Sequence, residues 1–164
     1  MDLSHITLPT TTGDALAFAG FGGRRAALLL GNQRTSSLVP EVAHALHAEP
    51  AAAGVPILQV AHLVGVPRVL RRIAERDIRR GLEAQRRAAR ELRAERGLDP
   101  ADVDRLVLLG LDWEGRVTTG LGFSSADRAP LAAIVDERSH VTDVIREGDL
   151  AKRLADHLTK ETAR

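Results

Sequence analysis

Cysteine is absent from this sequence, and aromatic residues make up only 2% of it. Without a thiol the chain can form no disulfide, hold no metal through thiolate ligands and carry out no thiol catalysis. The side chains left for chemistry are those of His, Asp, Glu, Ser and Thr. Because aromatic side chains are so scarce, aliphatic side chains must supply most of the core packing.

Long apolar runs are also missing. No stretch approaches the roughly 18 apolar residues of a membrane-spanning helix, and the first five residues lack the basic and then apolar segments of a secretory signal. We therefore expect a cytoplasmic protein with no membrane segment. A length of 164 residues, 44% of them hydrophobic and 27% charged, predicts a single globular domain over residues 1–164.

The net charge of +1 conceals an uneven distribution. Residues 67–96 contain eleven arginines and five acidic residues, so this segment carries +6 and the remainder −5. Such segments occur on nucleic-acid-binding surfaces, but more often they form the solvated face of a helix. The acidic residues interleave with the arginines and allow i,i+4 ion pairs, which favours the solvated helix over a nucleic-acid partner.

The first half of the chain has the pattern strand, helix, strand. Residues 26–30 form a short apolar run between glycines, which is typical of a buried strand. Residues 32–37 are rich in helix N-cap residues. The helix that follows has one apolar face, made of Leu38, Val39, Val42, Ala45 and Leu46. A second apolar run at residues 55–60 completes a βαβ unit, so the two strands should be parallel.

The second half begins with a long helical segment from Val66 to Arg96, with Gly97 as its C-terminal cap. Gly81 leaves open whether this segment is one helix or two. Its predicted apolar stripe consists of Val69, Leu70, Ile73, Ile78 and Leu82.

The remaining elements complete an α/β pattern. A third buried strand is expected at residues 106–111, then a turn and a short helix over residues 117–121. Residues 130–135 and 140–145 form an antiparallel hairpin, and a helix from 149 to 158 follows. The sequence therefore predicts a central mixed β-sheet flanked by helices, with the Arg-rich segment 67–97 as a helical insertion within the same domain.

The order of these elements, together with several local strings, resembles the thioredoxin-like redoxins, which comprise peroxiredoxins and related disulfide reductases. Residues 8–13 and 21–24 resemble the family's N-terminal hairpin and the lead-in to its next strand. The strings Leu-Gly-Leu-Asp-Trp-Glu-Gly-Arg-Val at 109–117 and Leu-Gly-Phe at 121–123 resemble a peroxiredoxin segment. Residues 129–136 resemble the family's strand that opens with a cis-proline, and Gly148 matches a glycine before its last helix. The resemblance implies a thioredoxin-like fold with an N-terminal hairpin.

The departures from the family concern its chemistry. Pro40 resembles the proline inside the family's first helix, and counting back from it places Asn32 and Thr35 at the two cysteine positions of a disulfide reductase. A peroxidatic cysteine would fall near Thr35, and the arginine that assists it is replaced by Pro130. The resemblance thus implies a degenerate, cysteine-less member, to which neither peroxide reduction nor disulfide exchange carries over. Ser139 stands where the family's hairpin turn has glycine.

A candidate ligand site follows from a general rule for open α/β sheets, in which ligands bind beyond the carboxyl ends of the parallel strands. The rule selects residues 32–37, His62, Asp112 and, if the proline is cis, Ala129 and Pro130. A helix N-terminus beside Arg34 favours an anion, and the candidate ligand-binding residues are Asn32, Gln33, Arg34, Thr35, Ser36 and Pro130. The alternative is that Thr35 to Ser37 only cap the helix.

Two of the selected residues are candidates for acid–base chemistry. His62 is a candidate general base, since imidazole is the side chain that most readily exchanges protons near neutral pH, and Asp112 is its candidate partner. A structural role for His62 is the alternative. Ser36 or Ser37 would complete the residue types of a hydrolytic triad, but the motif around a nucleophilic serine is missing.

Three further side chains deserve a prediction. His44 and His47 have a chelating spacing, yet the sequence shows no third ligand, so no metal site is expected. Trp113, the only tryptophan, lies on a predicted turn and is expected to be exposed and to mark a contact surface.

The leading hypothesis is a non-redox thioredoxin-fold protein that binds a partner protein, a second copy of itself or a small anionic ligand at the degenerate active-site rim. The second hypothesis is a cysteine-independent enzyme that uses His62 and Asp112 at the same rim. The third is nucleic-acid binding through the Arg-rich helix. No cofactor is expected.

Overall fold

The computed structural model describes residues 1–21 and 23–162, so Gly22 of the predicted lead-in and the last two positions of the predicted domain lie outside it. Its centre is a five-stranded sheet in the order β5-β4-β3-β6-β7. The parallel strands are β3 (Ala26–Gly31), β4 (Ile57–His62) and β5 (Val107–Asp112). β6 (Leu131–Val135) is antiparallel to β3, and β7 (Val141–Ile145) is antiparallel to β6. The predicted mixed sheet is therefore confirmed, with strand ends shifted by one or two residues.

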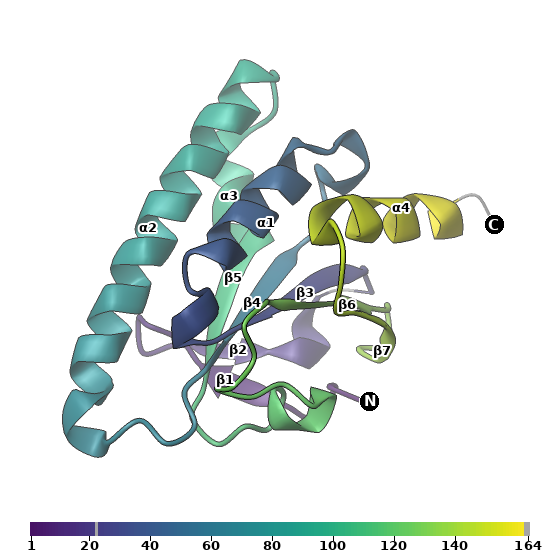
Figure 1. Ribbon diagram of the computed structural model, residues 1–164. Helices are drawn as coiled ribbons and strands as arrows, with labels where there is room; N and C mark the ends of the chain where they lie inside the picture. The colour runs from purple at the N-terminus through teal and green to yellow at the C-terminus, as the bar shows by residue number, and fades with distance from the viewer. Residues whose placement is uncertain (22, 163–164) are drawn as a thin grey trace.

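Helices cover one face of the sheet. α1 (Leu38–Ala48) and α4 (Leu150–Thr162) lie together on this face, and α2 (Arg71–Glu95) and α3 (Val103–Leu106) lie beside β5 (Figure 1). Apolar side chains of β3, β4 and β6 pack with α1 and α4, while Leu82 and Ala89 of α2 pack on Val107. None of the described helices is both long and apolar enough to cross a membrane.

The N-terminal segment covers the other face. Its hairpin consists of β1 (Thr7–Pro9) and β2 (Ala15–Ala17), as the resemblance implied. Leu8 of this hairpin belongs to the same buried cluster as Phe18, Leu28 and Phe123. A Cβ atom on Gly110 of β5 would lie 2.9 Å from Leu8 Cδ1, so the glycine allows the hairpin to approach the sheet this closely.

The buried face of α1 differs from the predicted one. Leu38 is 37% exposed and Ala45 is also exposed. The buried residues are instead Val39, Ala43, Leu46 and His47, which follow the i, i+4, i+7, i+8 spacing of one helical stripe. The prediction is confirmed for Val39 and Leu46, and Val42 is partly buried against the same core; it was wrong for Leu38 and Ala45, because Ala-rich helices offer a weak apolar contrast between faces.

α2 is one continuous helix, so the open question at Gly81 is settled in favour of a single helix. Gly97 has a φ of +71°, as expected for a C-terminal cap. The predicted apolar stripe is wrong for its first members, because only Leu82 of that set is buried and Val69 is 84% exposed. The buried residues of α2 are Leu82, Ala89 and Arg93, all in its second half, so the first half lies beyond the packed core.

The turn after β5 and the turn between β6 and β7 can both be compared with the sequence analysis. The predicted short helix after β5 is a 3₁₀ turn, Thr119–Leu121. In the β6–β7 turn, Ser139 has a φ of +66°, the left-handed conformation that glycine usually takes. Its hydroxyl donates a 2.8 Å hydrogen bond to the carbonyl of Phe18, which fixes this conformation without a glycine.

Candidate functional site

The carboxyl ends of the three parallel strands meet at one edge of the sheet, here called the rim. β3 ends at Gly31, directly before Asn32, and β4 and β5 end at His62 and Asp112, which are register partners. β6 begins one residue after Pro130, since Leu131 is paired with Leu30. The structure therefore brings Asn32, His62, Asp112 and Pro130 to the same edge, as the sequence predicted.

The segment after β3 is closed by its own hydrogen bonds. Asn32 Oδ1 accepts from the backbone N–H groups of Arg34 (2.9 Å) and Thr35 (3.0 Å), and Thr35 Oγ1 accepts from the N–H of Asn32 (2.9 Å). This reciprocal capping box begins the 3₁₀ turn Gln33–Thr35. The alternative that Thr35 to Ser37 cap the helix is therefore wrong in its residues: the capping side chain is Asn32, it caps the 3₁₀ turn, and Ser37 before α1 makes no side-chain cap.

Asn32 also fastens the neighbouring loop to the rim. Its Nδ2 donates to the carbonyls of Ser124 (2.8 Å) and Asp127 (2.9 Å). Asn32 is 6% exposed and Thr35 is fully buried, so the polar atoms at the two positions where a disulfide reductase has cysteines are already used. Of the predicted ligand set, Gln33, Arg34 and Ser36 remain at the surface.

Pro130 is buried, and the Ala129–Pro130 peptide bond is trans, because no cis bond occurs within the described residues. The isomer of Pro130, which the sequence left open, is therefore trans, unlike the family's cis-proline. Trans is the ordinary isomer of an X–Pro bond by about 0.5–1 kcal/mol. The path of the chain before Pro130 is held instead by the two hydrogen bonds from Asn32.

His62 and Asp112 are connected through a third residue, Thr118. The Thr118 hydroxyl donates to Asp112 Oδ2 (2.9 Å) and lies 2.7 Å from His62 Nδ1. Because that hydroxyl proton is already given to the carboxylate, the second bond requires Nδ1–H of His62 as its donor. The neutral ring then keeps the lone pair on Nε2, which forms no hydrogen bond within the described part of the chain.

Asp112 itself acts as the cap of the following turn. Its carboxylate accepts from the N–H groups of Arg116 (2.9 Å), Val117 (3.0 Å) and Thr118 (2.8 Å), besides the Thr118 hydroxyl. Asp112 and Thr118 are fully buried and His62 is 8% exposed, so the histidine is the only one of the three with any surface open to solvent. The predicted serine partner is not in place, since Ser36 Oγ donates to the carbonyl of Gln33 (3.1 Å).

Sequence reasoning missed Thr118. Its contact with His62 joins residues 56 positions apart, and no local pattern signals such a pair. Phe123, whose ring stands edge-on to His62 at 6.1 Å between centroids, was known only as part of a resembling string.

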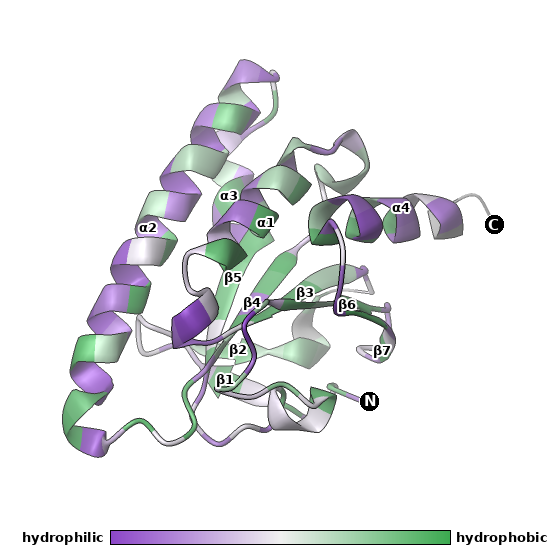
Figure 2. Ribbon diagram, viewed as in Figure 1, coloured by the Kyte–Doolittle hydropathy of each residue, from purple (hydrophilic) through white to green (hydrophobic). Residues whose placement is uncertain are grey.

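The surface beside the rim is apolar and basic at the same time. Large apolar side chains are exposed along the connection from β4 into α2, and Figure 2 shows them as green segments at the lower end of α2 among purple ones. We define the rim patch as these four: Val64 (43% exposed), Val69 (84%), Leu70 (47%) and Ile73 (48%).

Trp113 is half-buried, so the prediction of an exposed turn residue is wrong. The guanidinium of Arg71 lies over its ring, 4.7 Å from the centroid, and covers it. These two side chains and β1 form a groove of about 220 Å³, here called the Arg71–Trp113 groove. Thr7, Leu8, Pro9 and Arg116 also line it.

The two histidines of α1 have different environments. His44 is exposed and His47 is buried, and the described residues contain no group of three potential metal ligands. Burial lowers the pKa of His47 to about 4, helped by the positive charge of Arg93 and by His44. Its Nε2 has no hydrogen-bond partner, which is consistent with a neutral ring packed in the core.

Comparison with known proteins gives information on the fold of this chain. No protein-family model matches the chain, and no curated protein matches it. Solved structures do: DsbF of MTB (18% identity, 96% of each chain covered, TM-score 0.56) and the pneumococcal exposed lipoprotein thioredoxin Etrx1 of Streptococcus pneumoniae (15% identity, 94% of this chain and 98% of that one, TM-score 0.57). The chain has a thioredoxin-like fold. The bacterioferritin comigratory protein of Xanthomonas campestris is also similar (11% identity, 97% and 93% covered, TM-score 0.56).

The shared architecture confirms the resemblance seen in the sequence at the level of the fold. The Xanthomonas protein is described by its alkyl peroxide reduction activity, but such chemistry requires a thiolate. Since this thioredoxin-like chain has no cysteine, thiol-based redox chemistry is excluded for it.

Proposed function

We propose that this thioredoxin-fold chain is a non-redox binding protein, which recognises a partner protein through the rim patch rather than through a pocket inside the rim. The inner rim residues Asn32 and Thr35 satisfy each other's polar atoms and are buried. A ligand could reach them only by breaking the capping box, which makes the neighbouring surface the better contact site.

The observation that carries the proposal is the clustering of exposed apolar side chains. The described residues have eight large apolar side chains with at least 36% exposure. The four of the rim patch lie within ten residues of sequence, and Leu38 is the first residue of α1, the helix that follows the carboxyl end of β3 (Figure 1). Contiguous exposed apolar side chains next to arginine and tryptophan are typical of protein-binding surfaces.

Site-specific photocrosslinking in cells of the source organism tests the proposal. A photoreactive p-benzoylphenylalanine at Val69 should crosslink to one protein, identified by mass spectrometry. Val144 gives a matched control. It is 44% exposed and lies on β7, the outermost strand on the side of the sheet away from β5. The crosslink should disappear in Leu70→Asp. No product from position 69 in a folded variant, or the same products from position 144, would contradict the proposal.

A second candidate, a cysteine-independent enzyme, is favoured by the chain from Asp112 through Thr118 to His62. A carboxylate that orients an imidazole and leaves Nε2 free is the arrangement of a general base. In hydrolysis of an activated ester, Thr118→Val should reduce the rate and His62→Gln should abolish it. His140→Gln, a control at an exposed histidine, should keep the rate of the wild type. Equal rates in all three variants would remove this candidate.

A further inference from the structure

We infer that the Arg71–Trp113 groove binds a carboxylate side chain from an acidic segment of the partner protein, with Arg71 as the recognition residue. The inference rests on the proposed function and names the chemistry of the partner segment.

Arg71 has a free donor in a defined orientation. Its guanidinium lies over Trp113, 4.7 Å from the ring centroid, and its buried Nε–H has no acceptor among the described residues. No acidic side chain of the described chain lies within 4.0 Å of it as an ion-pair partner. A buried donor left unsatisfied is costly, and a planar carboxylate is the group that matches the guanidinium fork.

The acidic residues that line the groove are already engaged. Both oxygens of Asp112 accept hydrogen bonds from the turn that follows β5. Glu114 pairs with Arg116 at 2.7 Å. Leu8 and Pro9 are apolar residues among those that line the same groove. The groove therefore offers one unpaired cation beside an apolar surface, which suits a carboxylate flanked by an apolar side chain.

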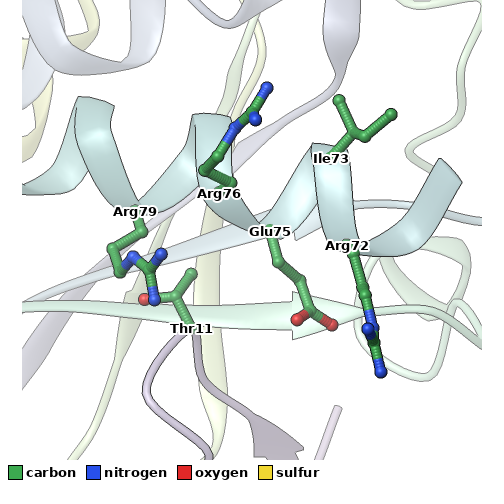
Figure 3. A pocket seen from close by; sticks show the side chains of 6 residues that line it. All are labelled: Thr11, Arg72, Ile73, Glu75, Arg76 and Arg79. Atoms are coloured by element: carbon green, nitrogen blue, oxygen red, sulfur yellow. The ribbon is translucent and has the colours of Figure 1, made fainter.

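A second groove continues the basic surface along α2. It has a volume of about 360 Å³ and lies between the hairpin tip at Thr11 and the first half of α2. Figure 3 shows Arg72, Glu75 and Arg79 directed toward the Thr11 side. Residues 68–80 contain six arginines and two acidic residues, so the surface that the partner meets is basic. Electrostatic complementarity then requires a partner segment with excess negative charge.

An acidic protein segment fits this surface better than a nucleic acid. Phosphate backbones prefer continuous positive charge, whereas Glu75 and Asp77 interrupt the arginines here. The aliphatic rim patch has no aromatic face on which unpaired bases could stack. A protein segment with alternating acidic and apolar residues can use both the arginines and the rim patch.

Fluorescence titration of the full chain with a peptide of four Glu-Leu-Ser repeats tests the inference. The peptide should bind at low salt, and the matched Gln-Leu-Ser peptide should bind at least about tenfold more weakly, since a charge-assisted pair is lost. Arg71→Gln should remove the difference between the two peptides. Arg71→Lys should retain only part of it, because the planar fork is lost. Arg87→Gln, an exposed arginine in the second half of α2, should leave it unchanged.

Each other outcome would overturn the inference. Equal binding of both peptides would contradict the carboxylate site, and so would an undiminished preference for the Glu peptide in a folded Arg71→Gln variant. The proposed function would still be tested separately, by the crosslink at Val69. Tighter binding to a dodecathymidylate or to phosphatidylserine vesicles than to the Glu peptide would assign the basic surface to those partners. Absence of any peptide binding would also reject the site.

Discussion

The two halves of α2 have similar compositions and opposite environments. In the second half, three of the four arginines are held by the protein and Arg87 is exposed: Arg86 donates twice to the carbonyl of Val107 (3.0 and 2.8 Å), Arg90 pairs with Asp104 (2.7 Å), and Arg93 is buried. In the first half, Arg76–Asp77 at 3.6 Å is the one ion pair among the described residues. The halves therefore differ in how many of their arginines are held by the rest of the protein, and not in how many arginines they contain.

The largest expected effect comes from Arg93, in the packed half. Arg93 is 7% exposed and donates to the carbonyls of Asp99 (2.9 Å) and Ala53 (2.6 Å), with Asp102 at 3.4 Å. Arg93→Ala should lower the free energy of unfolding by about 3–5 kcal/mol, because buried acceptors lose their donor. Arg72→Ala, in the exposed half, should change it by less than about 0.5 kcal/mol. Urea denaturation measures both, and equal losses would break the comparison.

Acid should destabilise the protein through His47, a residue of α1 whose carbonyl accepts a hydrogen bond from Arg96 at the end of α2 (3.4 Å). Its pKa in the folded state is about 4, below the ordinary histidine value of 6.5, so folding favours the neutral ring. The stabilisation is complete above pH 6.5 and is lost as the pH falls toward about 4, by at most about 3 kcal/mol.

His47→Leu is the control for this pH effect, since carboxylates titrate in the same range. The variant should unfold with a smaller loss of stability between pH 6.5 and 4 than the wild type. Parallel pH profiles of the two proteins would show that His47 is not responsible.

Truncating apolar side chains should also lower the free energy of unfolding more in the second half of α2 than in the first, by a smaller difference than the arginine variants. Leu82→Ala removes a side chain that is 7% exposed and should cost about 2–3 kcal/mol. Ile73→Ala, at 48% exposure, should cost less than about 0.5 kcal/mol while weakening partner binding. Thermal unfolding of both variants checks the difference. An Ile73→Ala loss as large as that of Leu82→Ala would mean that the rim patch is part of the core.

The smallest effect is expected at Gly81, where the two halves join. A Cβ atom at this position would meet nothing within 4 Å. Gly81→Ala should therefore stabilise the chain by about 0.5–1 kcal/mol through helix propensity. Destabilisation in a denaturant titration would indicate that the helix needs to bend or break at this residue.

Sequence patterns were sufficient for the sheet because its strands are continuous apolar runs such as residues 26–30. They were insufficient for α2, since the spacing of Val69, Leu70 and Ile73 is the same whether a core or a partner covers them. The direction of the parallel strands alone was enough to predict at which end of the sheet the candidate site lies. The connection of His62 to Asp112 through Thr118 did not, because it depends on how distant segments pack.

Hydrogen exchange along α2, with and without the partner identified by crosslinking, tests the central claim most directly. In the free protein, amides at 71–80 should exchange much faster than those at 82–93, since no core covers them. Adding the partner should slow the first group and leave the second unchanged. If residues 71–80 are already as protected as 82–93, or if the partner leaves them unprotected, the first half of α2 is not the binding surface.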